Sequence, residues 1–178
     1  MREITKIQIM DLTGIRGIAF DVDGVLSPCT IPMNEDGEPC RLLNVKDGYA
    51  IQLAVKTGLK LAIISGGRSK AVALRYRNLG VQDVYMGAQF KLPLFEQWLD
   101  ENGLDASEVI FVGDDIPDLH VMDAAGLSIA PADAAWQVKE AADYISPCDG
   151  GHGVARDIIE KVLIAQGMWM DDDHAFGW

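Results

Sequence analysis

Runs of consecutive apolar residues recur along the chain, and between them apolar residues return every three or four positions. The runs predict strands that are buried on both faces of a sheet, and the intervening segments predict amphipathic helices. The expected strands cover residues 18–21, 59–64, 81–86, 108–113, 127–130 and 144–145. The expected helices cover residues 49–56, 70–79, 90–99, 119–125, 134–142 and 154–165. Strands that alternate with helices through short connections predict an α/β fold, a Rossmann-like open parallel sheet with helices on both faces.

The segment 25–44 departs from this alternation. Two short extended runs flank Asn34-Glu35-Asp36-Gly37, and an Asp-Gly pair is a strong signal for the turn of a β-hairpin. With Asp36-Gly37 as a two-residue loop, Glu35 would pair with Glu38, and Cys29 and Cys40 would be out of register for a disulfide. The hairpin is too short to be a cap domain, so we expect it to cover part of a site or to pack against another subunit.

No internal repeat, linker or low-complexity tract divides the 178 residues, and this length suits one domain. We therefore expect a single domain over residues 1–178. The closing segment 168–178 mixes two tryptophans, a phenylalanine and three consecutive aspartates without helical periodicity. We expect this C-terminal tail to dock on a neighbouring surface.

Polar residues stand at the carboxyl ends of four expected strands, where the loops of a doubly wound sheet open on one crevice. These residues are, in chain order, Asp21 with Asp23, Ser65, Lys91, and Asp114 with Asp118. Carboxylates that face each other repel unless a cation neutralises them, so the acids predict a metal site. Asp21 and Asp114 would supply hard oxygen ligands for Mg²⁺, while Asp118 is better placed to orient a ligand or to hold Lys91.

Each of these residues also has a purely structural interpretation. Ser65 and Ser69 are both suited to cap the helix that follows them, and Asp47 is suited to cap the helix at 49–56. A single lysine such as Lys91 is more often a solvated surface residue. Four such coincidences at successive strand ends favour the functional interpretation.

The overall charge limits the partners of the chain. Fifteen basic and 27 acidic residues give a net charge of −12, which argues against nucleic acid or an anionic membrane as a partner. An anionic small molecule would then need a locally positive pocket, which Lys91 and the hydroxyl and backbone N–H groups after Ser65 would supply. The three cysteines are scattered without metal-ligand spacing, which indicates a reducing compartment, the cytoplasm.

Four ordered stretches resemble the motifs of the haloacid dehalogenase-like superfamily: Asp21-Val22-Asp23-Gly24, Ser65, Lys91, and Gly113-Asp114-Asp115 with Asp118. The resemblance implies that Asp21 is a nucleophile that becomes an aspartyl phosphate. It implies that Asp23 protonates the leaving alkoxide and then activates water, and that Mg²⁺ is bound by Asp21, the backbone carbonyl of Asp23, and Asp114. An aspartate in the place of Asp23 favours a phosphatase, since dehalogenases of the superfamily lack this acid and its ATPases carry threonine there.

A closer resemblance is to the 3-deoxy-D-manno-octulosonate 8-phosphate phosphatases of lipopolysaccharide biosynthesis. It rests on the first motif and on 36–38, 44–49, 65–69 and 150–153. That family lacks a cap domain and forms homotetramers whose hairpins pack together and whose subunits help to cover each other's active sites. The resemblance implies a sugar-acid phosphate as substrate, with Gly66, Arg68, Arg75 and Asp118 on the substrate side.

Two alternatives stand beside this hypothesis. Phosphatases of sialic-acid 9-phosphates (N-acylneuraminate or 2-keto-3-deoxynononate) share nearly all of these motifs, but that branch tends to carry glutamate in the place of Gly67. A phospho-acceptor signalling module also gathers acids and a lysine at strand ends. Such modules are shorter and phosphorylate an aspartate on a later strand, whereas Asp21 follows the first long strand.

Overall fold

The computed structural model describes residues 11–171 and 173–177, and for residues 173 and 174 only the backbone. The limits predicted for the domain (1–178) and for the tail (168–178) therefore include residues outside the described range.

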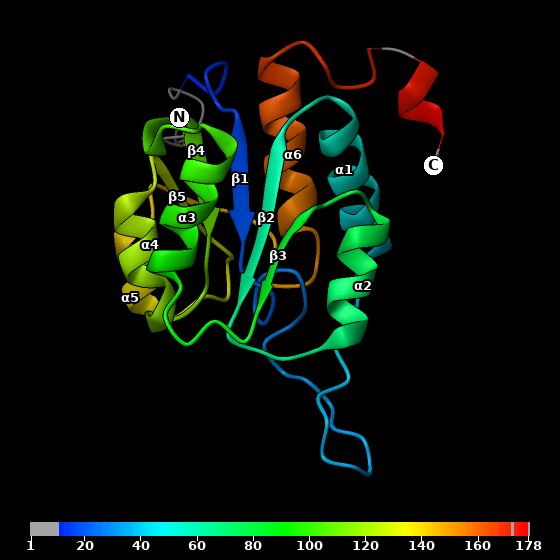
Figure 1. The fold of residues 1–178 in the computed structure, drawn as a ribbon, viewed down its shortest axis with the longest axis vertical. Helices are drawn as coiled ribbons and strands as arrows, with labels where there is room; N and C mark the ends of the chain where they lie inside the picture. Colours follow the sequence, from blue (N-terminus) through cyan, green and yellow to red (C-terminus); the bar gives the residue numbers. More distant parts are fainter. Residues whose placement is uncertain (1–10, 172, 178) are drawn as a thin grey trace, which may run out of the picture.

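Six parallel strands form one open sheet in the order β3-β2-β1-β4-β5-β6 (Figure 1). The strands are β1 (Gly17–Phe20), β2 (Lys60–Ser65), β3 (Asp83–Met86), β4 (Val109–Val112), β5 (Leu127–Ala130) and β6 (Tyr144–Ile145). β1 lies at the centre, where Gly17 pairs with Lys60 of β2 on one side and with Val109 of β4 on the other. The α/β fold predicted from the alternating pattern is confirmed.

Helices cover both faces of the sheet (Figure 1). They are α1 (Val45–Lys56), α2 (Lys70–Asn78), α3 (Leu92–Asn102), α4 (Leu119–Ala124), α5 (Trp136–Ala141) and α6 (Val154–Ala165). One core layer joins the sheet to α1, α2 and α6, and a second joins it to α3, α4 and α5. Within β1, Ile18 and Phe20 belong to the first layer and Ala19 to the second, which explains why this strand is apolar throughout.

The start of α1 differs from the prediction. Asn44 is the N-cap, and its side chain accepts a hydrogen bond from the backbone N–H of Lys46 at 2.9 Å. Asp47 lies in the first turn and is buried, and it accepts a hydrogen bond from the backbone N–H of Arg156 at 2.7 Å. Asp47 therefore caps α6, a partner distant in sequence, instead of its own helix.

The segment 25–44 does turn back on itself, but with a different register. Met33 bridges Pro39, and the backbone N–H of Asn34 donates to the carbonyl of Glu38 at 3.0 Å. The loop therefore has three residues and ends at Gly37, whose φ of 78° is in the left-handed region that favours glycine. The prediction of a two-residue loop was wrong, and the two arms of the hairpin are too short to be strands. Cys29 and Cys40 are unpaired, as expected.

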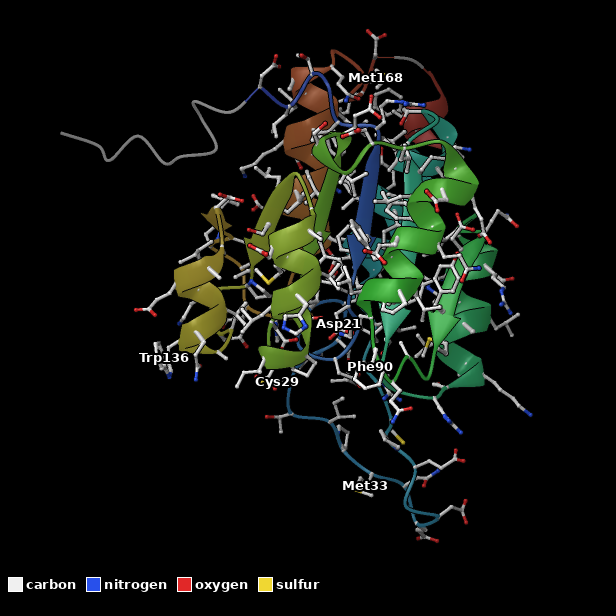
Figure 2. The ribbon with its side chains drawn as sticks, turned by 60° about the vertical axis from the view of Figure 1, so that its left-hand side comes forward. Asp21, Cys29, Met33, Phe90, Trp136 and Met168 are labelled. Atoms are coloured by element: carbon white, nitrogen blue, oxygen red, sulfur yellow. The ribbon has the colours of Figure 1, made fainter. Side chains whose placement is uncertain are left out.

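The described part of the tail packs on the surface formed by α1 and α6 of its own chain. The ring of Trp169 meets that of Tyr49 edge-on at 6.3 Å between centroids, and the guanidinium of Arg156 lies 4.5 Å from the Trp169 ring. Ala175 is buried against the first core layer, and its carbonyl accepts a hydrogen bond from the Tyr49 hydroxyl. The tail thus connects α1 and α6. It does so far from Asp21, because Met168, at the start of the tail, lies at the opposite end of the sheet (Figure 2).

Among residues 11–171 and 173–177, no helix combines the length and the apolar character that crossing a membrane requires.

Candidate active site

A cavity of about 890 Å³ opens at the carboxyl ends of the central strands. Figure 2 shows Asp21 at this end of the sheet, with Cys29 and Phe90 near it. The lining includes residues of all four motifs together with Gly66: Asp21, Asp23, Ser65, Gly66, Lys91, Asp114, Asp115 and Asp118. The strand order explains this convergence, because β2, β1 and β4 are neighbours and their ends meet at one edge.

Lys91 lies between two buried carboxylates. Its ammonium group is 2.9 Å from Oδ1 of Asp21 and 2.6 Å from Oδ1 of Asp118, and each of the three side chains is less than a tenth exposed. Burial by itself would lower the pKa of Lys91, but the charges of Asp21 and Asp118 outweigh it and raise the pKa. Lys91 is therefore a charged member of the site and not a solvated surface lysine.

Asp118 holds both Lys91 and the loop that leads to Asp114. While Oδ1 accepts from Lys91, Oδ2 accepts from the backbone N–H of Asp114 at 3.1 Å. Asp115 caps the short 3₁₀ turn Ile116–Asp118 through the backbone N–H of Ile116. Asp118 is thus a structural support of the site, with neither oxygen unpaired.

Asp21 and Asp114 form a carboxylate pair that favours a cation. Carboxylate oxygens of Asp21, Asp114 and Asp118 lie within 4.8 Å of one another. Burial first, and then the charge of Asp118, raises the pKa of Asp21 to about 7, although Lys91 opposes this. Burial and the charge of Asp21 raise the pKa of Asp114 to about 8. Since Asp118 is already occupied, Asp21 and Asp114 offer the hard oxygen donors that suit Mg²⁺.

Glycine at position 24 makes room for the second of these acids. A Cβ at Gly24 would lie 1.9 Å from Oδ2 of Asp114, and the φ of 88° is in the left-handed region. A side chain at position 24 would therefore displace Asp114, which explains the glycine of the first motif.

Ser65 ends β2 inside the cavity, and the glycine loop after it is exposed to the same space. The Ser65 hydroxyl is buried and accepts a hydrogen bond from the backbone N–H of Gly67 at 3.2 Å. Ser69, not Ser65, caps α2, by accepting from the backbone N–H of Val72. The two serines thus have separate roles, and Ser65 is left to the cavity.

Asp23 makes a contact that the sequence did not predict. Nε of Arg41 donates to its Oδ1 at 2.6 Å, and Nη2 of Arg41 donates to its Oδ2 at 2.7 Å. Arg41 belongs to the returning arm of the hairpin, so this arm reaches back to the first motif. Nothing in the sequence around Arg41 signals the contact, since it depends on the path of the hairpin in space.

Comparison with known proteins agrees with this geometry. Residues 91–158 match the model of the haloacid dehalogenase-like hydrolase family. The chain is 40% identical to 3-deoxy-D-manno-octulosonate 8-phosphate phosphatase KdsC of Escherichia coli K12 over 153 residues, which cover 86% of this chain and 81% of that protein. The chain belongs to this phosphatase family.

Solved structures of the family superpose closely on the chain. The crystal structure of the phosphatase from Yersinia pestis has a TM-score of 0.86 at 35% identity and covers 91% of this chain and 86% of its own. The structure from Moraxella catarrhalis, in complex with a magnesium ion, a phosphate ion and a KDO molecule, has a TM-score of 0.85 at 33% identity. It covers 91% of this chain and 92% of its own.

The structure does not bring Arg68 and Arg75 into the cavity of this family member. The side chain of Arg68 lies against Gly87, where its Nε would be 2.9 Å from an added Cβ. The guanidinium of Arg75 lies against Gly48 of α1, with Nη2 2.6 Å from the corresponding Cβ position. Both arginines follow Ser65 in sequence. Arg68 precedes α2 and lies against Gly87, whereas Arg75 is within α2 and lies against α1.

Proposed function

We propose that this protein is a Mg²⁺-dependent phosphatase that hydrolyses 3-deoxy-D-manno-octulosonate 8-phosphate through an aspartyl-phosphate intermediate. The observation that carries the proposal is the Asp21–Lys91–Asp118 cluster beside Asp114, in a cavity large enough for a sugar acid. The named activity of the E. coli relative supports the substrate, and the ligands of the Moraxella structure support the metal and the sugar acid.

Two half-reactions follow from the positions of the two acids. In the first, the Asp21 carboxylate attacks phosphorus, the bond to the sugar oxygen breaks, and Asp23 gives its proton to that oxygen. In the second, water attacks the phosphorus of phospho-Asp21, the P–O bond to Asp21 breaks, and Asp23 takes a proton from the water. Since Asp23 follows Asp21 by two residues, a single chain segment places both the nucleophile and the acid–base group in the lining of the same cavity.

The remaining residues bind the phosphate and hold its charge. The Ser65 hydroxyl and the backbone N–H of Gly66 donate to phosphate oxygens, and Lys91 adds a positive charge beside the nucleophile. Asp21, the backbone carbonyl of Asp23, and Asp114 would hold Mg²⁺, which offsets the negative charges of the phosphate and the carboxylates. Asp118 keeps Lys91 in place.

The assembly and location are proposals of the same kind. We infer a homotetramer in the cytoplasm, formed by one domain per chain and covered at its active sites by neighbouring subunits. The unpaired state of Cys29, Cys40 and Cys148 supports a reducing compartment. Arg68 and Arg75 would bind substrate only where such a neighbour completes the site, because they lie outside the cavity of a single chain.

Steady-state hydrolysis of eight-carbon and nine-carbon 2-keto-3-deoxy sugar phosphates, with and without Mg²⁺, tests the proposal. We expect the highest kcat/KM with the eight-carbon substrate, no turnover in EDTA, and a loss of at least about 10⁴-fold for Asp21→Asn. Preference for a nine-carbon substrate would reassign the sugar. A long-lived phospho-Asp21 without turnover would replace the phosphatase by a signalling module.

A further inference from the structure

The Arg41–Asp23 contact is too specific for an incidental surface ion pair. Two parallel hydrogen bonds of 2.6 and 2.7 Å join the guanidinium to the carboxylate. The Arg41 side chain is 6% exposed although the hairpin around it is open to solvent, whereas the Asp23 side chain is 34% exposed. Exposed lysine–acid pairs contribute little, but a buried two-point arginine contact fixes the plane of a carboxylate.

We propose that Arg41 is a positioning residue, which fixes the Asp23 carboxylate in the orientation for proton transfer to the leaving oxygen of the substrate. This inference rests on the proposed function, since it assigns a task to the acid–base step of that reaction. It also gives the hairpin a catalytic purpose within its own chain.

Burial of the Arg41 side chain is unfavourable by itself, and the hydrogen bonds with Asp23 offset this. Nη1 of Arg41 is buried without a hydrogen-bond partner among the described residues. A buried unpaired donor is unfavourable, and an arginine also loses much side-chain freedom when it is fixed. The side chain nevertheless stays beside Asp23, because Nε and Nη2 both bind the carboxylate there.

Gly67 provides the space that the guanidinium occupies. A Cβ at position 67 would lie 2.4 Å from Nη2 of Arg41 and 3.1 Å from Oδ2 of Asp23. No left-handed φ is found at Gly67, so alanine is acceptable to the backbone there. An alanine at this position would therefore act through the Arg41–Asp23 contact, and it offers a second way to break that contact.

Two substrates with different leaving groups distinguish a positioning role of Arg41 from a general loss of structure. An alkoxide needs a proton as it leaves, whereas p-nitrophenolate leaves without one. For Arg41→Ala we expect kcat/KM to fall about 30-fold with the sugar-acid phosphate and less than about 3-fold with p-nitrophenyl phosphate. Arg41→Lys keeps the charge but loses the two-point contact, so we expect it to resemble Arg41→Ala.

A double-mutant cycle tests whether Gly67→Ala lowers activity through the Arg41–Asp23 contact. Gly67→Ala should lower kcat/KM for the sugar-acid phosphate about as much as Arg41→Ala, and it should add less than about 2-fold once Arg41 is already alanine. Guanidinium ions added at millimolar concentration should restore part of the activity of Arg41→Ala. Arg77→Ala, which removes an exposed arginine of α2, is the matched control and should leave both substrates unaffected.

Three results would overturn the inference: equal losses on the two substrates, additive effects of the two substitutions, or full activity of Arg41→Ala. Circular dichroism and thermal melting of each variant show whether a loss comes from unfolding, and Gly67→Ala still tests the contact if Arg41→Ala does not fold. Turnover that survives Asp21→Asn would instead refute the proposed function, so the two failures are distinguishable.

Discussion

At the scale of single residues, the charge of Lys91 keeps Asp21 and Asp118 together. Both carboxylates are buried within hydrogen-bond distance of its ammonium group. Removal of one partner from a buried ion pair leaves charge without compensation, which costs much more than an exposed pair contributes. Lys91 is therefore as important for the stability of the site as for the charge of the phosphate.

For Lys91→Met in EDTA at pH 7.5, we expect the free energy of unfolding to fall by about 3 kcal/mol, measured by urea denaturation. The substitution preserves most of the side-chain volume but leaves the repulsion between Asp21 and Asp118 unopposed. The loss should be smaller at pH 5, because the pKa of Asp21 is raised to about 7 and the protonated carboxyl no longer repels its neighbour. Lys70→Met, at an exposed lysine, is the control, and an equal loss at both pH values would contradict the explanation.

The motif residues were predictable because their positions follow from chain order alone. Asp21, Ser65, Lys91 and Asp114 each come after an apolar run, and parallel strands bring such positions to one edge whatever the details of packing. Arg41 was not predictable, because its place depends on a three-residue hairpin loop and on the space above a glycine. Arg68 and Arg75 were expected on the substrate side by resemblance, but their side chains pack against Gly87 and against Gly48 of α1, contacts that residue type and chain order do not reveal.

At the scale of elements, the contact between α1 and α6 depends on Asp47. Its Oδ1 accepts from the N–H of Arg156 in the first turn of α6, while Oδ2 is buried without a partner among the described residues. Burial raises its pKa to about 6 from the ordinary value of 3.8, although the N–H groups of α6 oppose this. Folding thus favours the protonated form of Asp47 compared with the unfolded chain.

The raised pKa of Asp47 makes the stability of the protein depend on pH. Between pH 4 and about 6 the folded protein binds a proton at Asp47 that the unfolded chain releases, so stability falls as the pH rises through this range. Asparagine keeps the oxygen that caps α6 but never ionises. Compared with the wild type, Asp47→Asn should therefore gain stability as pH increases from 4 to 7, by up to about 3 kcal/mol.

Urea denaturation of Asp47→Asn and wild type at several pH values measures this difference, with Asp100→Asn on the exposed side of α3 as control. A difference that does not change with pH would contradict this explanation, because it would show that the pKa of Asp47 is the same in the folded and unfolded protein. The same contact explains why Asp47, expected as the N-cap of α1, caps α6 instead. Asn44 and Asp47 are equally suitable by residue type, and only the packing of α6 decides between them.

At the scale of the whole molecule, the hairpin has two contrasting sides. Arg41 turns inward to Asp23, while the exposed apolar residues Met33, Leu42 and Leu43, with Val45 at the start of α1, remain uncovered. The hairpin projects beyond the carboxyl end of the sheet (Figure 1). A projecting group of apolar side chains is typical of surfaces that pack against another protein, which in the proposed homotetramer would be another copy of the chain.

The combined substitution Met33→Glu and Leu42→Glu should break this packing. Analytical ultracentrifugation of the wild type should give the mass of four chains of 19.4 kDa each, and the variant should give a lower mass, because charges placed opposite their own copies repel. Leu74→Glu, at an exposed position of α2, is the control and should leave the mass unchanged. A variant that keeps the wild-type mass would place the subunit contact elsewhere.

The dissociated variant also separates the two tasks of the hairpin. The Arg41–Asp23 contact is made within one chain, so it should persist when subunits come apart, and kcat/KM for p-nitrophenyl phosphate should be retained. Activity on the sugar-acid phosphate should fall mainly through a higher KM, since the neighbouring surface proposed to cover the substrate would be lost while the acid–base group remains oriented. A fall in kcat with unchanged KM would mean instead that assembly, and not the chain itself, holds Arg41 on Asp23.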